Sequence, residues 1–258
     1  MKEYFSKKMS HSNTYIYGRN PLIEQLESEP AKIEKIFLRD NLSGRVLDKI
    51  KDSASQNRIP VSFVPGNKLF EMVGNVNDQG VVALISPVSY IDFHEWLENI
   101  NVDSGTAVLL LDEIEDPHNF GAILRSAAAA GISAVLVPKH RQSPVNAAVF
   151  KTSAGTAGRI PIVRVGNLNQ AILELKEQQF WIAGLDQAAE ATIWEMDATV
   201  PLAFVVGSED QGIRKKTAEH CDFIYTIPMM NRVESLNASV SAALVCYEWR
   251  RRKRLNNE

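Results

Sequence analysis

The sequence of 258 residues has few of the side chains that build metal sites or disulfide frameworks. Its two cysteines, Cys221 and Cys246, are not spaced as metal ligands, and its five histidines are scattered along the chain. No apolar run approaches the roughly 18 residues of a membrane span. Residues 1–13 are polar and lack the apolar core of a signal peptide. We therefore expect a cytoplasmic protein that binds no metal ion and no membrane.

Two glycine-rich phosphate-binding motifs are also missing. The acidic stretch Glu113–Pro117 follows a predicted strand at the point where a dinucleotide-binding fold would carry Gly-x-Gly-x-x-Gly. The P-loop pattern Gly-x-x-x-x-Gly-Lys-Ser/Thr does not occur. The sequence therefore argues against phosphate-rich cofactors and against a nucleotide-dependent oxidoreductase.

The chain as a whole is not strongly basic, because its formal net charge is −3. The charge is uneven: residues 1–90 carry 12 basic and 10 acidic side chains, and the rest of the chain carries 16 and 21. Five of those 16 bases form one run, Arg250–Arg254. This run is either a solvated helix end, where cations suit the helix dipole, or a patch that faces RNA.

The sequence divides into a tail, two α/β domains and a connector. Residues 1–13 predict a loose tail, and residues 14–88 alternate helix and strand in a small unit with its own core, where Asn20-Pro21 predicts a helix start. Residues 89–105 are rich in acids and amides and predict a connector with a short helix around Trp96. Residues 106–258 form the larger domain.

The larger domain alternates strands and helices regularly. The fold class is therefore an α/β domain with a parallel sheet that helices cover on both sides. The expected helices lie near Gly121–Ala130, Pro144–Thr152, Leu168–Gln178 and Ile213–His220, with a last one from about Ser239 to Arg254. The expected strands are Ala107–Leu111, Ala134–Val137, Ile160–Val165, Trp181–Leu185, Leu202–Val206 and Phe223–Ile227.

Three polar stretches follow predicted strands: residues 116–125, 207–212 and 227–239. Each combines glycine or proline with side-chain amides, hydroxyls or charges. Ligands of open α/β sheets bind beyond the carboxyl ends of the strands, so these stretches predict a binding site.

The same stretches resemble the three motifs of the SpoU (TrmH-like) branch of the SPOUT RNA methyltransferases. They occur in the family's order, with family-like gaps, across about 106–254. The motifs are Asn119-x-Gly121-x-x-x-Arg125-Ser126-Ala127, Gly207-x-Glu209-x-x-Gly212, and Ile227-Pro228-Met229 followed by Ser235-Leu236-Asn237-x-Ser239.

Residues 14–88 also resemble the amino-terminal substrate-binding domain of this branch's ribosomal RNA 2′-O-methyltransferases. The marks are Tyr17-Gly18 before the first helix and Gln79-Gly80-Val81 at the end of the unit. The two resemblances together cover nearly the whole chain.

The resemblance implies transfer of a methyl group from S-adenosylmethionine to a ribose 2′-hydroxyl of RNA. It also implies a homodimer and a carboxyl-terminal domain tied in a deep trefoil knot. A guanosine of 23S ribosomal RNA is the favoured acceptor, and transfer RNA is the rival substrate. A catalytically silent RNA-binding protein of the same fold is a further alternative, against which the intact motif residues argue.

The resemblance assigns the site residues. Gly207, Ile227 and Leu236 would bind the cofactor, and the catalytic set is Arg125, Asn119, Glu209, Ser235 and Asn237. Glycine at 207 would permit a close approach to the cofactor.

Two readings remain open for several of these residues. Arg125 would be the general base, or would hold phosphate and stabilise the developing alkoxide; a guanidinium with a pKa above about 12 favours the second. Asn119 would orient Arg125 or the substrate, or cap a helix. Glu209 would pair with a cation or with loop backbone. Asn231 departs from the family, which often has glycine nearby, so the loop could have a different backbone shape.

Overall fold

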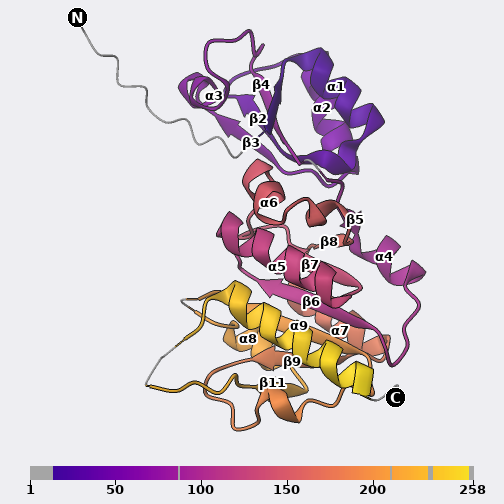
Figure 1. Cartoon of the computed structure of the whole chain (residues 1–258). Helices are drawn as coiled ribbons and strands as arrows, with labels where there is room; N and C mark the ends of the chain where they lie inside the picture. The colour runs from indigo at the N-terminus through magenta and orange to yellow at the C-terminus, as the bar shows by residue number, and fades with distance from the viewer. Residues whose placement is uncertain (1–13, 87, 210, 232–234, 256–258) are drawn as a thin grey trace, which may run out of the picture. The chain divides into compact units, whose positions relative to one another are not determined.

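The structure is a computed structural model that describes residues 14–86, 88–209, 211–231 and 235–255 (Figure 1). The predicted tail, residues 1–13, lies outside this range. The chain divides into two compact units. The first contains residues up to Ser89 together with Pro144–Ala148, and the second contains Tyr90–Ser143 and the chain from Val149 onward.

The first unit is a four-stranded sheet with the strand order β1-β4-β2-β3. β2 and β3 are parallel, and the other neighbours are antiparallel. Apolar side chains of α1, α2 and the sheet form its core, which includes Leu22, Leu47 and Ile36. Its elements are β1 (Thr14–Tyr17), α1 (Arg19–Ser28), η1 (Pro30–Lys32), β2 (Ile33–Arg39), α2 (Arg45–Gln56), β3 (Val61–Val64), α3 (Gly66–Val73) and β4 (Val81–Ile85).

The predicted start of the first helix was wrong by two residues. Gly18, with φ +91°, is the N-cap of α1, and Pro21 stands at the third helical position instead of the first. The sequence pattern also missed β1 and α3. α3 is eight residues long and buries one of them, Leu69, so it gives only a short sequence signal.

The second unit is built on a parallel sheet of seven strands, in the order β11-β9-β10-β6-β7-β8-β5. The six predicted strands are confirmed within two residues at each end. The strands are β5 (Ile91–Asp92), β6 (Ala107–Asp112), β7 (Ala134–Pro138), β8 (Ile162–Val165), β9 (Trp181–Leu185), β10 (Leu202–Gly207) and β11 (Phe223–Tyr225).

Helices cover both faces of this sheet, as the alternating pattern predicted (Figure 1). α4 and α7 pack on one face through Phe93, Trp96 and Ile172, and Ile213 joins them just before α8. α5 and α9 pack against each other on the other face. The helices are α4 (Phe93–Asn99), α5 (Pro117–Ala130), α6 (Ala147–Thr152), η2 (Thr156–Gly158), α7 (Leu168–Glu177), η3 (Ile193–Glu195), α8 (Lys215–Ala218) and α9 (Ala238–Leu255).

Residues 89–105, expected as a connector, contain β5 and α4, and Trp96 lies on the short helix that was expected there. β5 pairs with β8 and so extends the large sheet at its edge. The trefoil knot stays a prediction. In the described part of the chain, no helix has the length and apolarity to span a bilayer.

The carboxyl ends of β6, β10 and β11 lie at one edge of the sheet, because all its strands are parallel. β6 pairs with β10 up to the last rung, where Asp112 stands opposite Gly207. The first polar stretch begins four residues after Asp112 and the second begins at Gly207, so the fold brings them together. We call this edge the rim.

Candidate functional site

Three motif residues from distant parts of the chain meet at the rim. The Asn119 amide donates to Oε1 of Glu209 at 2.7 Å. The Asn237 amide donates to Oδ1 of Asn119 at 2.9 Å, and it donates to the same Glu209 oxygen. The backbone N–H of Ala238 adds a fourth contact, to Glu209 Oε1, at 3.3 Å. We call Asn119, Glu209 and Asn237 the rim network.

The first turn of α5 holds Asn119 in this network. α5 begins at Pro117, earlier than the sequence suggested, and Asp116 is its N-cap. The Asp116 carboxylate accepts from the backbone N–H groups of His118 and Asn119. The hypothesis that Asn119 caps the helix is therefore wrong, and its side chain is free to join Glu209. Of the two partners expected for Glu209, a cation or backbone, the described residues supply the backbone N–H of Ala238, together with two side-chain amides.

Asn237 has two structural tasks at once. Its Oδ1 accepts from the backbone N–H of Ser239 at 3.0 Å, and its carbonyl accepts from Val240 and Ser241, so it caps α9. Its amide nitrogen serves the rim network. Capping and participation in the site therefore do not compete.

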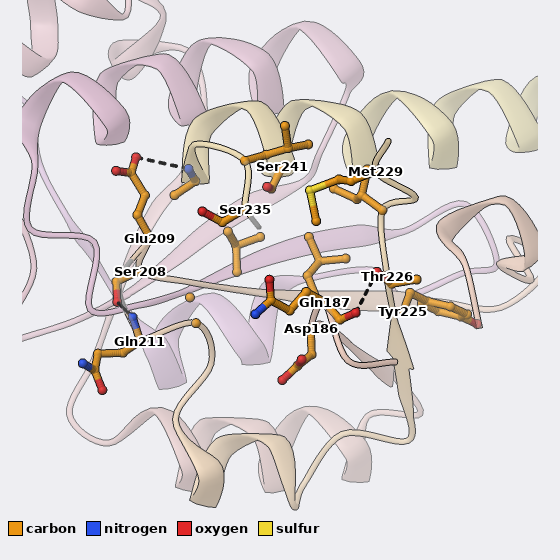
Figure 2. A pocket seen from close by; sticks show the side chains of 17 residues that line it. Asp186, Gln187, Ser208, Glu209, Gln211, Tyr225, Thr226, Met229, Ser235 and Ser241 are labelled. Atoms are coloured by element: carbon orange, nitrogen blue, oxygen red, sulfur yellow. Dashed lines mark hydrogen bonds between the residues drawn. The ribbon is translucent and has the colours of Figure 1, made fainter. Parts of the chain in front are cut away.

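A cavity of about 220 Å³ opens beside the network (Figure 2). The cavity is lined by all three residues predicted to bind a cofactor, Gly207, Ile227 and Leu236, and by Ser235.

The two ends of the cavity are formed by different parts of the chain. One end is lined by Ser208, Glu209 and Gln211, and the other by Tyr225 and Thr226. Four further residues line it: Asp186, Gln187, Met229 and Ser241. Met229 belongs to the third motif but was assigned no role, and Asp186 and Gln187 were missed because the strand end at 185 carries no motif.

The cavity offers both apolar and polar surface. Val206, Ile227 and Leu236 supply apolar walls, while Asp186 and Ser235 supply a carboxylate and a hydroxyl. Burial and the nearby Asp197 carboxylate raise the pKa of Tyr225 above its ordinary value, so its hydroxyl remains protonated at neutral pH. Such walls fit a ligand with an aromatic base and an amino-acid end.

Glycine is required at 207 for a reason that adds to the expected close approach of a cofactor, which stays a prediction. A Cβ atom at Gly207 would lie 2.0 Å from the carbonyl carbon and oxygen of Gly212. The absent side chain therefore lets the loop fold back on itself.

A second cavity, of about 310 Å³, shares a wall with the first. Ser208, Glu209, Gln211 and Ala238 line both. The remaining walls come from the β6–α5 loop and α5: Glu113, Ile114, Glu115, Asp116 and Asn119. Glu209 of the rim network therefore stands between two adjoining spaces.

Arg125 is not part of this arrangement. It is exposed on α5, lines neither cavity, and makes no hydrogen bond or ion pair with the residues that the structure describes. The Asn119 side chain bonds to Glu209 and Asn237, so among the described residues it does not hold Arg125 in place.

Asn231 adopts φ +57°, the left-handed region that glycine favours. Asparagine tolerates this conformation better than most residues, so the departure from glycine does not by itself exclude a glycine-like backbone here. Among the described residues, no group of histidines, cysteines and carboxylates could hold a metal ion.

The basic run at the end of α9 is partly neutralised. Glu248, buried on α9, accepts from Arg251 at 2.8 Å and from Arg252 at 2.6 Å. The hydrogen bond from Arg251 lowers the pKa of Glu248, and Arg252 adds to the effect. Arg250 is exposed and makes no hydrogen bond or ion pair with the described residues, so its guanidinium is available to an external anion.

Comparison with known proteins gives two family matches. The model of the SpoU rRNA Methylase family matches residues 106–247, and a second, RNA 2′-O ribose methyltransferase substrate binding, matches residues 15–91. The chain is 38% identical to the 23S rRNA (guanosine-2′-O-)-methyltransferase RlmB of Xylella fastidiosa (strain 9a5c) over 249 residues, which cover 96% of this chain and 100% of that protein.

Solved structures share the fold. The SpoU methyltransferase AviRb from Streptomyces viridochromogenes, in complex with the cofactor AdoMet, superposes with a TM-score of 0.60 at 22% identity, over 97% of this chain and 94% of that one. The TrmH/SpoU tRNA modifying enzyme of A. aeolicus gives a TM-score of 0.55 at 26% identity, over 64% and 86%.

Proposed function

The chain belongs to the SpoU rRNA Methylase family, and from this premise we propose that it methylates a ribose 2′-hydroxyl of a guanosine in 23S ribosomal RNA. S-adenosylmethionine is the donor. The observation that carries the proposal is the pair of adjoining cavities with Glu209 in their common wall. Two substrates that exchange a methyl group need such neighbouring sites.

The first cavity suits the donor. S-adenosylmethionine has no phosphate, which agrees with the missing glycine-rich phosphate motifs. Gly207, Ile227 and Leu236 would line its binding site, with polar contacts from groups such as Asp186 and Ser235. Bound there, the donor would supply a methyl group from a positively charged sulfur: a nucleophilic oxygen would bond to the methyl carbon as the carbon–sulfur bond breaks, and the sulfur would leave as an uncharged thioether.

The second cavity would receive the acceptor nucleoside. Glu209 Oε1 is occupied by amide and backbone donors, and Oε2 accepts no hydrogen bond within the described chain. We assign Oε2 to the ribose hydroxyl, whose proton it can accept as a hydrogen bond. Asn119 and Asn237 hold the carboxylate in place, and alignment of this kind can supply several kcal/mol, up to roughly 7–11, of rate acceleration.

Arg125 would act on the RNA from outside the single-chain network, and both of its roles stay open. A guanidinium that binds phosphate and stabilises a developing negative charge needs no change of protonation. A guanidinium that acts as a base needs a large depression of its pKa, and each unit costs about 1.4 kcal/mol. The first role therefore requires less free energy than the second.

The proposal includes a homodimer. Val240 and Tyr247 are 45% and 52% exposed on α9, on the side of that helix away from its buried residues Ala242, Val245 and Trp249. An apolar stripe of this kind fits a second copy of the chain. Sedimentation of wild type and Tyr247→Glu tests this, and a wild-type monomer at micromolar concentration would reject it.

The choice of ribosomal RNA is supported by the extent of the match to RlmB and by the substrate-binding match over residues 15–91. Such a substrate implies action in the cytoplasm. The test is methyl transfer from labelled S-adenosylmethionine to purified 23S ribosomal RNA and to transfer RNA, followed by mapping of the modified nucleotide. Incorporation into transfer RNA alone would refute the substrate, and no incorporation despite RNA binding would indicate a silent binding protein.

A further inference from the structure

The loop that carries Glu209 is closed on itself. We call residues 207–209 and 211–214 the Glu209 loop. The Gly212 N–H donates to the Ser208 carbonyl at 2.9 Å, and the Gln211 N–H donates to the Ser208 hydroxyl at 3.3 Å. Since Gly207 also touches Gly212, the loop is locally compact. Its orientation relative to the sheet therefore depends on how its two ends are attached.

Both ends are attached to Asp112. Gly207 pairs with Asp112 in the last rung between β10 and β6. At the other end, the Arg214 backbone N–H donates to Asp112 Oδ2 at 3.1 Å, and Arg214 Nε donates to Oδ1 at 2.7 Å. Nη2 of Arg214 also lies 2.7 Å from Oδ1. The Asp112 side chain is fully buried, whereas that of Arg214 is 44% exposed.

Arg214 also reaches the start of the β6–α5 loop. Its Nη1 lies 3.1 Å from Oε1 of Glu113, an oxygen that Arg141 contacts at 3.3 Å. Glu113 has φ +64°, a conformation that residues other than glycine rarely adopt. One guanidinium therefore joins the exit of the Glu209 loop to two consecutive residues of the segment that leads to Asn119.

We infer that Asp112 and Arg214 are positioning residues for methyl transfer. They fix the Glu209 loop relative to α5, so that Glu209 and Asn119 meet in the wall between the two cavities. The inference rests on the proposed function. The planar guanidinium of Arg214 contacts Asp112 and Glu113 through different nitrogens. A lysine at this position would carry the same charge, but its single nitrogen could not make both sets of contacts.

The test compares Arg214→Lys with Arg141→Lys in the full-length protein. Both substitutions keep the charge, and both alter a contact to Glu113. Steady-state methyl transfer gives kcat and the KM values, calorimetry gives the cofactor Kd, and thermal unfolding gives Tm. We expect Arg214→Lys to lower kcat about tenfold or more, with a smaller change in the KM for RNA and a Tm within about 3 °C of wild type. Arg141→Lys should stay within about twofold of wild type throughout.

A wild-type kcat in Arg214→Lys would overturn the inference. If that variant is unstable, the double variant Asp112→Asn/Arg214→Gln decides, because it leaves no lone buried charge. A folded double variant with wild-type kcat would show that the pair serves folding alone, whereas a slow one supports positioning. A wild-type protein that methylates no RNA would instead overturn the proposed function, and the inference with it.

Discussion

Asn119 and Arg125 lie on one helix and belong to one motif, yet their surroundings differ. Asn119 is bonded to Glu209 and Asn237, whereas Arg125 is exposed and has no side-chain partner in the described chain. Six residues turn a helix by about 600°, so the two side chains point about 120° apart, and they are separated by about 9 Å along the axis. A single motif thus combines a residue that the chain itself holds with one that is open to an external partner.

The largest expected effect is that of Arg125→Ala. If Arg125 acts on the RNA, kcat should fall about 10²–10³-fold, the loss typical of a removed charge-stabilising donor. Cofactor Kd should stay within about twofold of wild type, because Arg125 lines neither cavity. The free energy of unfolding should change by less than about 0.5 kcal/mol, as for other exposed positions. Methyl transfer, calorimetry and urea unfolding measure the three quantities.

Arg125→Lys separates the two roles of this residue and serves as its control. Lysine keeps the positive charge, so a rate well above that of Arg125→Ala indicates an electrostatic or phosphate-binding role. A nearly normal rate in the alanine variant would remove Arg125 from the mechanism. The motif would then not combine a residue bonded within the chain with one that acts on an external partner.

Glu209→Gln should have the next largest effect, and of a different kind. Glutamine keeps the size but loses the charge that strengthens the hydrogen bonds from Asn119, Asn237 and Ala238. We expect kcat to fall about 10–100-fold, and the cofactor Kd to rise as well, because Glu209 lines both cavities. Arg125→Ala should change kcat alone. Equal cofactor Kd values in the two variants would contradict the distinction between Glu209, which is bonded within the chain, and Arg125, which is available to an external partner.

Much of the fold could be predicted from the sequence. Apolar runs such as Ala107–Leu111 and Leu202–Val206 are long enough to define buried strands, and their alternation with helices defines a parallel sheet. β5 was missed because two residues carry no periodic signal. α5 was placed too late because Asp116-Pro117, its cap and first residue, was taken for part of a loop.

The site was predictable residue by residue but not as an arrangement. Polar stretches at strand ends indicated where it lies. Which side chains meet depends on β10 lying beside β6, an order that the sequence does not reveal. The contact between Arg214 and Asp112 joins residues 102 positions apart. Arg214 had been placed in a predicted helix, where it looked like an ordinary surface charge.

Gly207→Ala should have a moderate effect. It tests whether the rim network depends on the closed conformation of the Glu209 loop. The added methyl group would clash with Gly212, so we expect the free energy of unfolding to fall by about 1–3 kcal/mol. Cofactor affinity should fall too, because the displaced loop lines the donor cavity. Gly166→Ala is the matched control: its Cβ meets no atom within 4 Å. Equal Tm values for the two variants would show that the Glu209 loop can open at little cost.

The smallest expected effect concerns the two thiols, of which Cys246 is buried and Cys221 is partly buried. Burial, with the Asp222 carboxylate, raises the pKa of Cys221 from 9.0 to about 11, and burial raises that of Cys246 to about 12. Both are therefore neutral at pH 8, and iodoacetamide should leave methyl transfer unchanged there. Because the folded pKa values are raised, stability is fully present below pH 9 and falls as the pH rises toward 11 and 12. Mass spectrometry of alkylated protein and urea unfolding at pH 8 and 10 measure these effects. Rapid inactivation at pH 8 would place a reactive thiol at the site. Arg125 on α5 would then not be the only kind of site residue that is available to an external molecule.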